Sequence, residues 1–228
     1  MAIILLMQNI KECIKSLDFF KNLNEQDFEQ LLKISSLKEC PISYTFNYEE
    51  DVSDKIVFLV DGLLKAYKVD RQDNEIFLNY IYKNSLVSEV SSLQENAIRC
   101  YSNTECVQDS IFLEINYKLF KKYFIETNIL THQFIEEILN NTKQLYCIID
   151  RELVFDAMAK VAYSLYDDLA MFNNLKRQEV ANMLHIQPAT LSRVLKKLVR
   201  QEIITIETTN ILISNKKGLI KIFNGASL

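Results

Sequence analysis

The sequence predicts an α+β protein in which a compact antiparallel β unit is followed by a long helix and a small C-terminal helical unit. Between Tyr44 and Ile115, short apolar runs alternate with turn-forming residues, as antiparallel strands require. From Thr127 to Arg151, apolar residues recur at steps of three and four, which is typical of a helix. From Leu175 to Ile206, two short amphipathic segments precede residues that favour strands.

Two helices are expected before the β unit. The opening segment MAIILLMQNIKECIK has an apolar run too short to span a membrane, so we interpret it as the apolar face of a first helix. It also lacks a basic leader and a small-residue cleavage site, which predicts a cytoplasmic protein without a membrane partner. Between Leu17 and Ser35, Asn24 is expected to cap a second helix, with Asp27 three residues later and an apolar continuation through Leu31, Leu32 and Ile34.

The β unit consists of about eight short strands in this interpretation. The apolar runs that predict them are KIVFLV, GLLKAYKV, EIFLNYIY, TECVQ and SIFLEI. Turn material such as VDG and DRQDNE separates the runs, and runs of this length with such spacing are typical of antiparallel sheets.

Length and charge indicate two domains and a local rather than a general affinity for nucleic acid. The 228 residues exceed a typical domain of ~100–150 residues. The net charge of −4 argues against a protein that coats nucleic acid indiscriminately. A locally basic surface remains compatible with this balance, because the acidic residues can lie elsewhere.

The segment from Leu175 to Ile206 has the pattern of a helix-turn-helix that reads the DNA major groove. Its apolar residues at helical spacing are Ala181, Leu184, Ile186, Leu191, Val194, Leu195 and Leu198. The opposite face carries one acid, Glu179, against the basic residues Lys176, Arg177, Arg193, Lys196, Lys197 and Arg200. Pro188 suits the first turn of the second helix, where its missing N–H costs nothing. An ordinary amphipathic helix pair with a solvated charged face is the alternative, and the order of the parts favours DNA binding.

The residues RQEVANML, a turn, QPATLSRVLKKL and a short strand pair resemble the winged helix-turn-helix of the Crp/Fnr superfamily of bacterial transcription regulators. The layout of the β unit is similar to the jelly-roll-like β-roll of the same family, which contains cyclic-nucleotide-binding members. The resemblance implies a homodimeric regulator that binds a palindromic double-stranded operator, with RNA polymerase as a further partner. It implies no enzymatic activity, and the chain shows no nucleophile beside a base and therefore no catalytic residues.

The resemblance also implies which residues contact DNA. Arg193 corresponds to an arginine that contacts guanine, whose O6 and N7 atoms accept from the guanidinium fork, and Ser192 can pair with several base edges. Ala189 departs from the family, which often carries a glutamate there that accepts from cytosine. His185 stands where the family usually has a glycine, and we interpret it as a turn residue because His tolerates a left-handed backbone. The predicted DNA contacts are Arg177, Gln187, Pro188, Ala189, Thr190, Ser192, Arg193, Lys196 and Lys197.

The expected effector pocket departs from the cyclic-nucleotide pattern. Family members that bind cyclic AMP carry a Gly-Glu pair and a downstream Arg-Ser or Arg-Thr, and they contact the purine from the long helix. The predicted pocket positions in this chain are Ser88, Glu89, Arg99, Cys100, Leu145 and Tyr146. Only the Glu and the Arg match, so we do not expect cyclic AMP to bind. The β-roll then senses another small molecule, or regulation is independent of a ligand or controlled by a partner.

Cysteine and histidine usage does not predict a metal cofactor. The cysteines are Cys13, Cys40, Cys100, Cys106 and Cys147, without a C-x-x-C pair, so we expect neither an iron–sulfur cluster nor another metal site. We interpret them as small buried apolar residues, with a redox-active Cys100 and Cys106 as the alternative. A haem sensor is a further alternative, for which His132 is the candidate axial ligand.

A coiled-coil seam on the long helix would provide the dimer. Its predicted residues are Phe134, Ile138, Leu145 and Ile148, with Asn141 and Thr142 as polar positions that set the register. The alternative is a helix that packs on its own domain. The predicted domains are a sensor at 1–126, a dimerisation helix and hinge at 127–152, and a DNA-binding domain at 153–228. The hinge is expected near Asp150 to Asp156.

Overall fold

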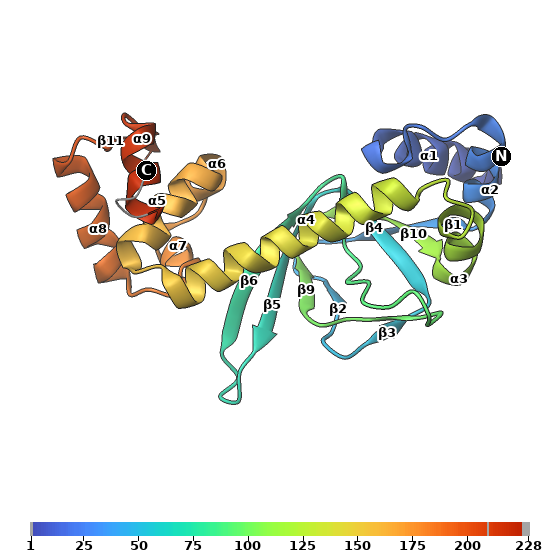
Figure 1. Cartoon of the computed structure of the whole chain (residues 1–228), viewed down its shortest axis with the longest axis horizontal. Coiled ribbons are helices and arrows are strands. Elements are labelled where there is room, and N and C mark those ends of the chain that lie inside the picture. Colours follow the sequence, from blue (N-terminus) through green and yellow to red (C-terminus); the bar gives the residue numbers. More distant parts are fainter. Residues whose placement is uncertain (1, 209, 225–228) are drawn as a thin grey trace. The chain divides into compact units, whose positions relative to one another are not determined.

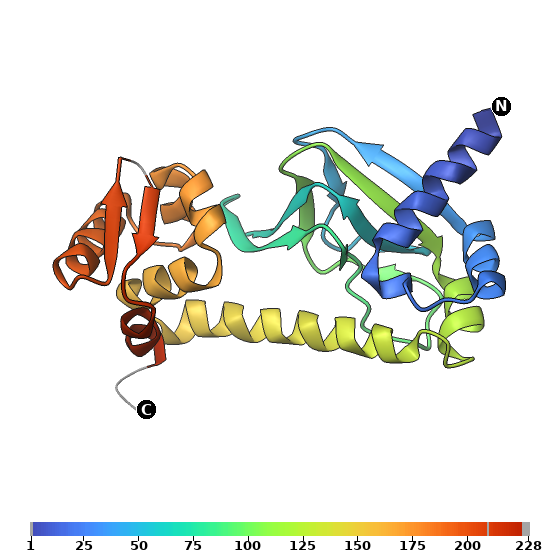
Figure 2. The same cartoon turned by 90° about the horizontal axis from the view of Figure 1, so that it is seen from above.

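The computed structural model describes residues 2–208 and 210–224. Two compact units make up the chain, residues 1–144 and residues 145–228. Figures 1 and 2 show the course of the chain from the N-terminal helices in blue, through the strands of the β unit in blue to green and the long helix in yellow, to the C-terminal unit in orange and red. The N-terminal helices, the β unit, the long helix and the C-terminal helical unit follow one another as predicted, so the α+β class is confirmed.

The N-terminal helices form as predicted, and a strand that was not predicted follows them. They are α1 (Ala2–Ser16), the short 3-10 helix η1 (Asp18–Phe20) and α2 (Glu25–Lys33). The Asn24 side chain accepts from the backbone N–H of Asp27 at 2.9 Å, which confirms the cap. After α2, strand β1 (Ser35–Cys40) pairs along its whole length with β10 (Ser110–Asn116). No local sequence pattern predicts a partner so far along the chain.

Two four-stranded antiparallel sheets form the β-roll. One has the order β1-β10-β4-β7 and the other the order β2-β9-β5-β6, while β3 and β8 form a separate pair. The bounds are β2 (Thr45–Asn47), β3 (Val52–Ser53), β4 (Lys55–Asp61), β5 (Leu63–Val69), β6 (Glu75–Tyr82), β7 (Ser85–Leu86), β8 (Ile98–Arg99), β9 (Asn103–Cys106) and β10 (Ser110–Asn116). The antiparallel roll that the apolar runs predicted is therefore present. Between the sheets lie Cys40, Val57, Leu59, Leu64, Val87, Cys106 and Phe112.

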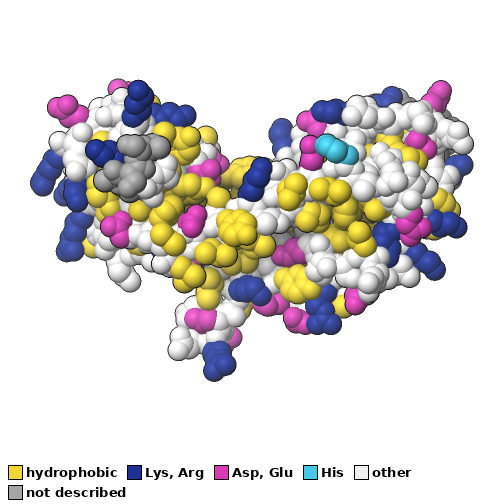
Figure 3. Space-filling model, viewed as in Figure 1, with side chains coloured by type: hydrophobic (Ala, Val, Ile, Leu, Met, Phe, Trp, Pro, Cys, Tyr) yellow, Lys and Arg dark blue, Asp and Glu magenta, His cyan; other side chains and the backbone are white. Residues whose placement is uncertain are grey.

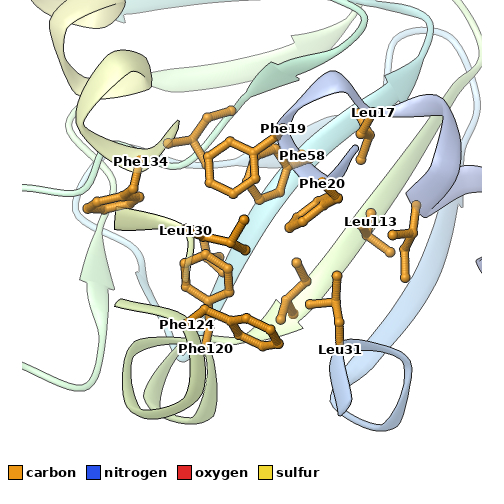
Figure 4. Close-up of a cluster of buried hydrophobic side chains, with 14 of the residues drawn as sticks. Leu17, Phe19, Phe20, Leu31, Phe58, Leu113, Phe120, Phe124, Leu130 and Phe134 are labelled. Atoms are coloured by element: carbon orange, nitrogen blue, oxygen red, sulfur yellow. The ribbon is translucent and has the colours of Figure 1, made fainter. Parts of the chain in front are cut away.

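A second, aromatic core joins the N-terminal helices, the roll and the start of the long helix. Helix α3 (Tyr117–Phe120) and the π-helical segment η2 (Lys121–Ile125), which lie between the roll and the long helix, also contribute to it. Figure 4 shows the side chains of this core packed against one another. The rings of Phe19 and Phe58 lie 4.8 Å apart and those of Phe120 and Phe134 lie 6.4 Å apart. Rings at these separations pack favourably in tilted arrangements. The start of the long helix is thus fixed to the roll through Phe134.

The long helix α4 (Thr131–Ile149) continues into the π-helical segment η3 (Asp150–Val154). The structure corrects the predicted seam at its first two positions. Phe134 is only 4% exposed within the core of its own unit, and Ile138 packs against the same core. Ile148 is half-buried, and Leu145 is exposed. A different apolar row faces solvent along this segment, and its members are Ile135, Leu139, Tyr146, Ile149 and Leu153.

The C-terminal unit is a small helical domain with a β-hairpin. It contains α5 (Ala157–Asp167), α6 (Leu169–Asn174), α7 (Arg177–Met183), α8 (Pro188–Arg200), β11 (Ile204–Glu207), β12 (Asn210–Ile213) and α9 (Lys216–Asn224). Asp156 caps α5 by accepting from two backbone N–H groups at 2.8 and 2.9 Å. The predicted wing strands are present, and helix α9 follows them. Among the described residues, no helix has the length and apolar character that crossing a bilayer requires.

Candidate nucleic-acid interface

The turn between α7 and α8 has a left-handed residue, as predicted. His185 has a φ of 50°, which few non-glycine residues adopt. Its backbone N–H donates to Asn182 at 3.0 Å, and the next N–H, of Ile186, donates to Ala181 at 3.0 Å. Pro188 then occupies the first turn of α8. The turn therefore holds the two helices in a defined relation, as a helix-turn-helix requires.

Burial divides α8 into two faces. Leu191, Val194, Leu195 and Leu198 point into the core of the C-terminal unit. The other face exposes the polar residues Ser192, Arg193, Lys196, Lys197 and Arg200. At the N-terminal end of the helix, Gln187 and Ala189 are exposed, while Pro188 and Thr190 are half-buried. The predicted contact residues of α8 thus lie on its outer face or at its start, where a groove of DNA can be reached.

A basic groove borders this face. It has a volume of about 830 Å³ and runs between the start of α7, α8 and the hairpin strand β11. Arg177 at the start of α7 contributes to its wall and lies 5.7 Å from the Phe172 ring. Burial lowers the pKa of Arg177 from its ordinary value, and a guanidinium remains charged at neutral pH. The other cationic residues that line the groove are Lys176, Lys196 and Arg200.

The hairpin that borders the groove is held by an asparagine. The side chain of Asn173 donates to the Ile211 carbonyl at 3.0 Å and accepts from the Ile211 N–H at 2.9 Å. This pair of bonds ties β12 to α6, and β12 pairs in turn with β11. No local sequence pattern points to Asn173, because the bonds connect segments 38 residues apart.

The C-terminal unit is basic although the whole chain is acidic. Residues 145–228 contain 11 basic and 8 acidic side chains, a net charge of +3, against 15 basic and 22 acidic in residues 1–144, a net charge of −7. Figure 3 shows Lys and Arg side chains gathered over the part of this unit in which α8 lies. A positive surface of this kind attracts the phosphate backbone of nucleic acids.

A half-buried carboxylate connects the segment after α4 to the turn. Glu152 of η3 contacts Nε of Arg151 at 2.7 Å, Nζ of Lys160 at 3.3 Å and Nδ1 of His185 at 2.9 Å. Burial alone would raise the pKa of Glu152, but the hydrogen bonds and charges of Arg151 and His185 outweigh it and lower the pKa to about 2. An ionised carboxylate only accepts, so Nδ1 of His185 carries the proton. Glu152 and Lys160 belong to no sequence motif, so their role could not be predicted from the sequence.

The lowered pKa predicts that Glu152 contributes to stability above its ordinary pKa near 4.5 and loses this contribution as the pH falls towards 2. The loss is on the order of 3 kcal/mol. Urea unfolding of the protein and of Glu152→Gln between pH 6 and 3 measures it, with the exposed Glu207→Gln as control. We expect the gap between Glu152→Gln and the unmodified protein to shrink with acidification. A constant gap would show that the carboxylate is not held in its charged form.

The predicted effector pocket is only partly assembled. Ser88, Glu89 and Cys100 line a polar cavity of about 10 Å³ in the roll, which is room for about one water molecule. Glu89 accepts from the backbone N–H groups of Tyr101 and Ser102 and from the Ser102 hydroxyl. Arg99 is not in the lining. It is 54% exposed and pairs with Glu50 at 2.6 Å.

The other predicted pocket residues, Leu145 and Tyr146, are exposed on α4, at 60% and 64%. Redox chemistry needs accessible, reactive thiols, whereas Cys40, Cys100 and Cys106 are buried. Burial raises the pKa of Cys100 to about 11 and also raises the pKa of Cys40 and Cys106. A thiol with a raised pKa is a poor nucleophile. His132 is an exposed residue beside Glu136, and no group of three or more metal-ligating side chains occurs in the described part of the chain.

Comparison with known proteins places the C-terminal unit in a family. Residues 159–222 match the Crp-like helix-turn-helix domain. The search of curated proteins gives no significant match. Among solved structures, a substituted CooA from Carboxydothermus hydrogenoformans is 16% identical, with a TM-score of 0.71 over 90% of this chain and 94% of its own. FixK2 from Bradyrhizobium japonicum is also 16% identical, with a TM-score of 0.63 over 85% and 100%.

A structure from Eubacterium rectale that is assigned to the crp/fnr family gives a TM-score of 0.62 at 13% identity, over 92% of this chain and 100% of its own. At these identities the solved structures show that the fold is shared. The match of the helix-turn-helix domain is a similarity in sequence and lies within the C-terminal unit. Residues 159–222 thus form a Crp-like helix-turn-helix domain, and the chain has the fold of these solved structures.

Proposed function

We propose that the protein is a homodimeric transcription regulator that binds a palindromic DNA operator through α8. The exposed polar face of α8 on a helix-turn-helix carries this proposal. Arg193 is its base reader, because a guanidinium fork matches the O6 and N7 acceptors of guanine, and Ser192 contacts a neighbouring base edge. Gln187, Pro188, Ala189 and Thr190 lie at the end of α8 that enters the major groove first.

Phosphate contacts supply most of the affinity in this proposal. Lys196, Lys197 and Arg200 lie further along the exposed face of α8, and Arg177 stands at the start of α7. Lysine and arginine at such places neutralise backbone phosphates and carry no sequence information by themselves. The basic groove beside β11 supports this assignment of phosphate contacts, since its cationic side chains lie beside α8.

A second copy of the chain covers the exposed apolar row of α4 and η3. Ile135, Leu139, Thr142, Tyr146, Ile149 and Leu153 follow one another at steps of four and three residues. This spacing is that of a coiled-coil seam, in which one polar position helps to set the register. A palindromic operator requires two-fold symmetry of the protein, and a dimer formed through this seam would present one α8 to each half-site.

The roll regulates without cyclic AMP in this proposal. Ser88 replaces the glycine, Glu89 is bound by the chain's own N–H groups, and Arg99 pairs with Glu50. The sensor therefore takes another small effector, or control is by a partner or by abundance, while a haem or redox sensor finds little support in an exposed His132 and buried thiols. RNA polymerase is the expected protein partner, and the cytoplasm the expected compartment.

Selection of binding sites from a random DNA pool tests the proposed function. We expect the purified protein to enrich a short palindrome with a guanine in each half-site, and to bind it at least ~10³-fold more tightly than unrelated DNA at physiological salt. Enrichment of no common sequence would contradict sequence-specific regulation. Enrichment of a single half-site without its repeat would contradict the dimeric mode.

Cyclic AMP should not bind. The carboxylate and arginine that would hold its ribose and phosphate are engaged elsewhere, and the cavity has room for about one water molecule. Isothermal calorimetry at physiological nucleotide concentrations is the measurement, and cyclic GMP serves as the control ligand. A saturable isotherm in the micromolar range that disappears in Arg99→Ala would restore a nucleotide sensor.

A further inference from the structure

We infer that Glu152 and His185 form a latch that couples the segment after α4 to the turn of the helix-turn-helix and so positions α8 for base reading. The inference rests on the proposed function, since it assigns to these two residues an effect on DNA recognition. Neither residue contacts DNA in this interpretation. Both are positioning residues that act through the backbone of the turn.

The contact belongs to a half-buried cluster, in which the His185 side chain is 26% exposed. The side chain of Glu152 is 28% exposed, and those of Lys160 and Arg151 are 10% and 13% exposed. Both cations approach the carboxylate, and His185 adds its Nδ1 at 2.9 Å. Partly buried charge pairs with several hydrogen bonds resist separation, because each group that is left unpaired loses both its partner and its hydration. Glu152 is therefore held in place.

The residue at the other end of the latch controls the start of α8. His185 lies two residues before Gln187, which precedes the first residue of α8. With a φ of 50°, its backbone is in a region that glycine adopts freely and other residues adopt at a cost. The imidazole contact with Glu152 offsets that cost and ties the turn to η3. A shift of the turn would displace the N-terminal end of α8, and with it Ala189 and Arg193.

Aromatic packing makes η3 a firm anchor for the latch. Phe155, which ends the π-helical segment, lies 5.6 Å from the Tyr163 ring and 6.3 Å from the Phe223 ring, measured between ring centroids. Tyr163 and Phe223 are themselves in edge contact at 5.4 Å. These contacts fix η3 to α5 and α9, both within the C-terminal unit. Because η3 continues directly from α4, a change in the last turns of α4 reaches the turn of the helix-turn-helix through Glu152.

The decisive variant is His185→Gly. Glycine retains the left-handed backbone of the turn and removes only the imidazole. Glu202→Gly is the matched control, because Glu202 is another non-glycine residue of this unit with a φ of 56°. We expect His185→Gly to lower the affinity for the selected operator about tenfold, as loss of a charge-assisted hydrogen bond would. Affinity for unrelated DNA should stay unchanged, so that the ratio of the two affinities falls. Glu202→Gly should leave the ratio as it is.

A variant cycle separates positioning from mere stability. Glu152→Ala should lower the same ratio, and Glu152→Ala with His185→Gly should lower it no further, because one contact is lost in each case. Glu152→Gln keeps an oxygen that accepts from Nδ1 and should recover most of the ratio. Additive losses, an unchanged ratio in His185→Gly, or an equal loss in Glu202→Gly would overturn the latch. His185→Gly leaves the carboxylate and its cations in place, so it serves even where Glu152→Ala does not fold.

A measurement without DNA keeps the latch separate from the proposed function. A proton on Nδ1 of His185 that is held by Glu152 should exchange slowly with water and give an NMR signal, and this signal should vanish in Glu152→Ala. If the unmodified protein binds no preferred sequence but shows the signal, the proposed function fails and the contact stands. If it selects an operator while His185→Gly keeps the full ratio, the function stands and the latch fails.

Discussion

Replacing Arg193 by alanine should weaken binding to the best operator by about 1–3 kcal/mol per half-site and relax selectivity at one base pair. Arg193 is exposed on the outer face of α8, so its removal disturbs no part of the core. In a symmetric dimer the loss applies to both half-sites. Site selection from random DNA, followed by titration on the parent operator, measures both effects.

Lys197→Ala is the matched control on the same helix. It should weaken binding about equally to all sequences and reduce the salt dependence by roughly one counterion, as expected for a phosphate contact. Ala189→Glu adds a carboxylate that accepts from cytosine and should change the preferred half-site without loss of the fold. If Arg193→Ala selects the parent sites with the parent's relative affinities, Arg193 is not the base reader.

Replacing Leu139 by aspartate should dissociate the dimer and leave the monomer folded. Leu139 is 54% exposed in the single chain, so in the proposed seam an unpaired carboxylate would be buried only on dimerisation. A buried charge without a partner costs on the order of 3–5 kcal/mol. Analytical ultracentrifugation at micromolar concentration should show a dimer for the unmodified protein and a monomer for Leu139→Asp.

The neighbouring residue gives the opposite expectation. Ile138 packs against the aromatic core of its own unit, so Ile138→Asp should destabilise the roll by about 2 kcal/mol or more, as loss of apolar packing does. Thermal unfolding distinguishes the two variants, since only Ile138→Asp should lower the melting temperature of the N-terminal unit. A monomeric unmodified protein, or a Leu139→Asp dimer as stable as the parent's, would contradict the proposed seam.

The difference between Ile138 and Leu139 shows what helical periodicity cannot predict. Apolar residues recur on two faces of α4, and both rows have steps of three and four residues. The row that begins at Phe134 is used at its start by the aromatic core, whereas the row that begins at Ile135 faces solvent. Periodicity predicts that a helix has an apolar face, but which face meets which partner depends on the surface against which the helix packs.

The pocket of the roll shows the same limit for polar residues. Four predicted pocket residues correspond in position to residues that bind nucleotides in the family that the chain resembles. Of these, Ser88, Glu89 and Cys100 line the cavity, and Arg99 does not. Arg99 is on strand β8, which pairs with β3, and this pairing places its guanidinium beside Glu50. A partner 49 residues away along the chain decides the role of Arg99.

The sequence by itself determined the features that depend on neighbouring residues. The cap at Asn24, the left-handed turn at His185, the start of α8 at Pro188 and its basic outer face all follow from patterns within a few residues. Only the tertiary structure decided the pairing of β1 with β10, the burial of Phe134, the pairing of Arg99 and the contact of Glu152 with His185. The physical reason is the range of the interactions. Capping, turn geometry and helical amphipathicity act over one or two turns of chain, whereas strand pairing and burial join distant segments, whose free energies are settled only when the whole core forms.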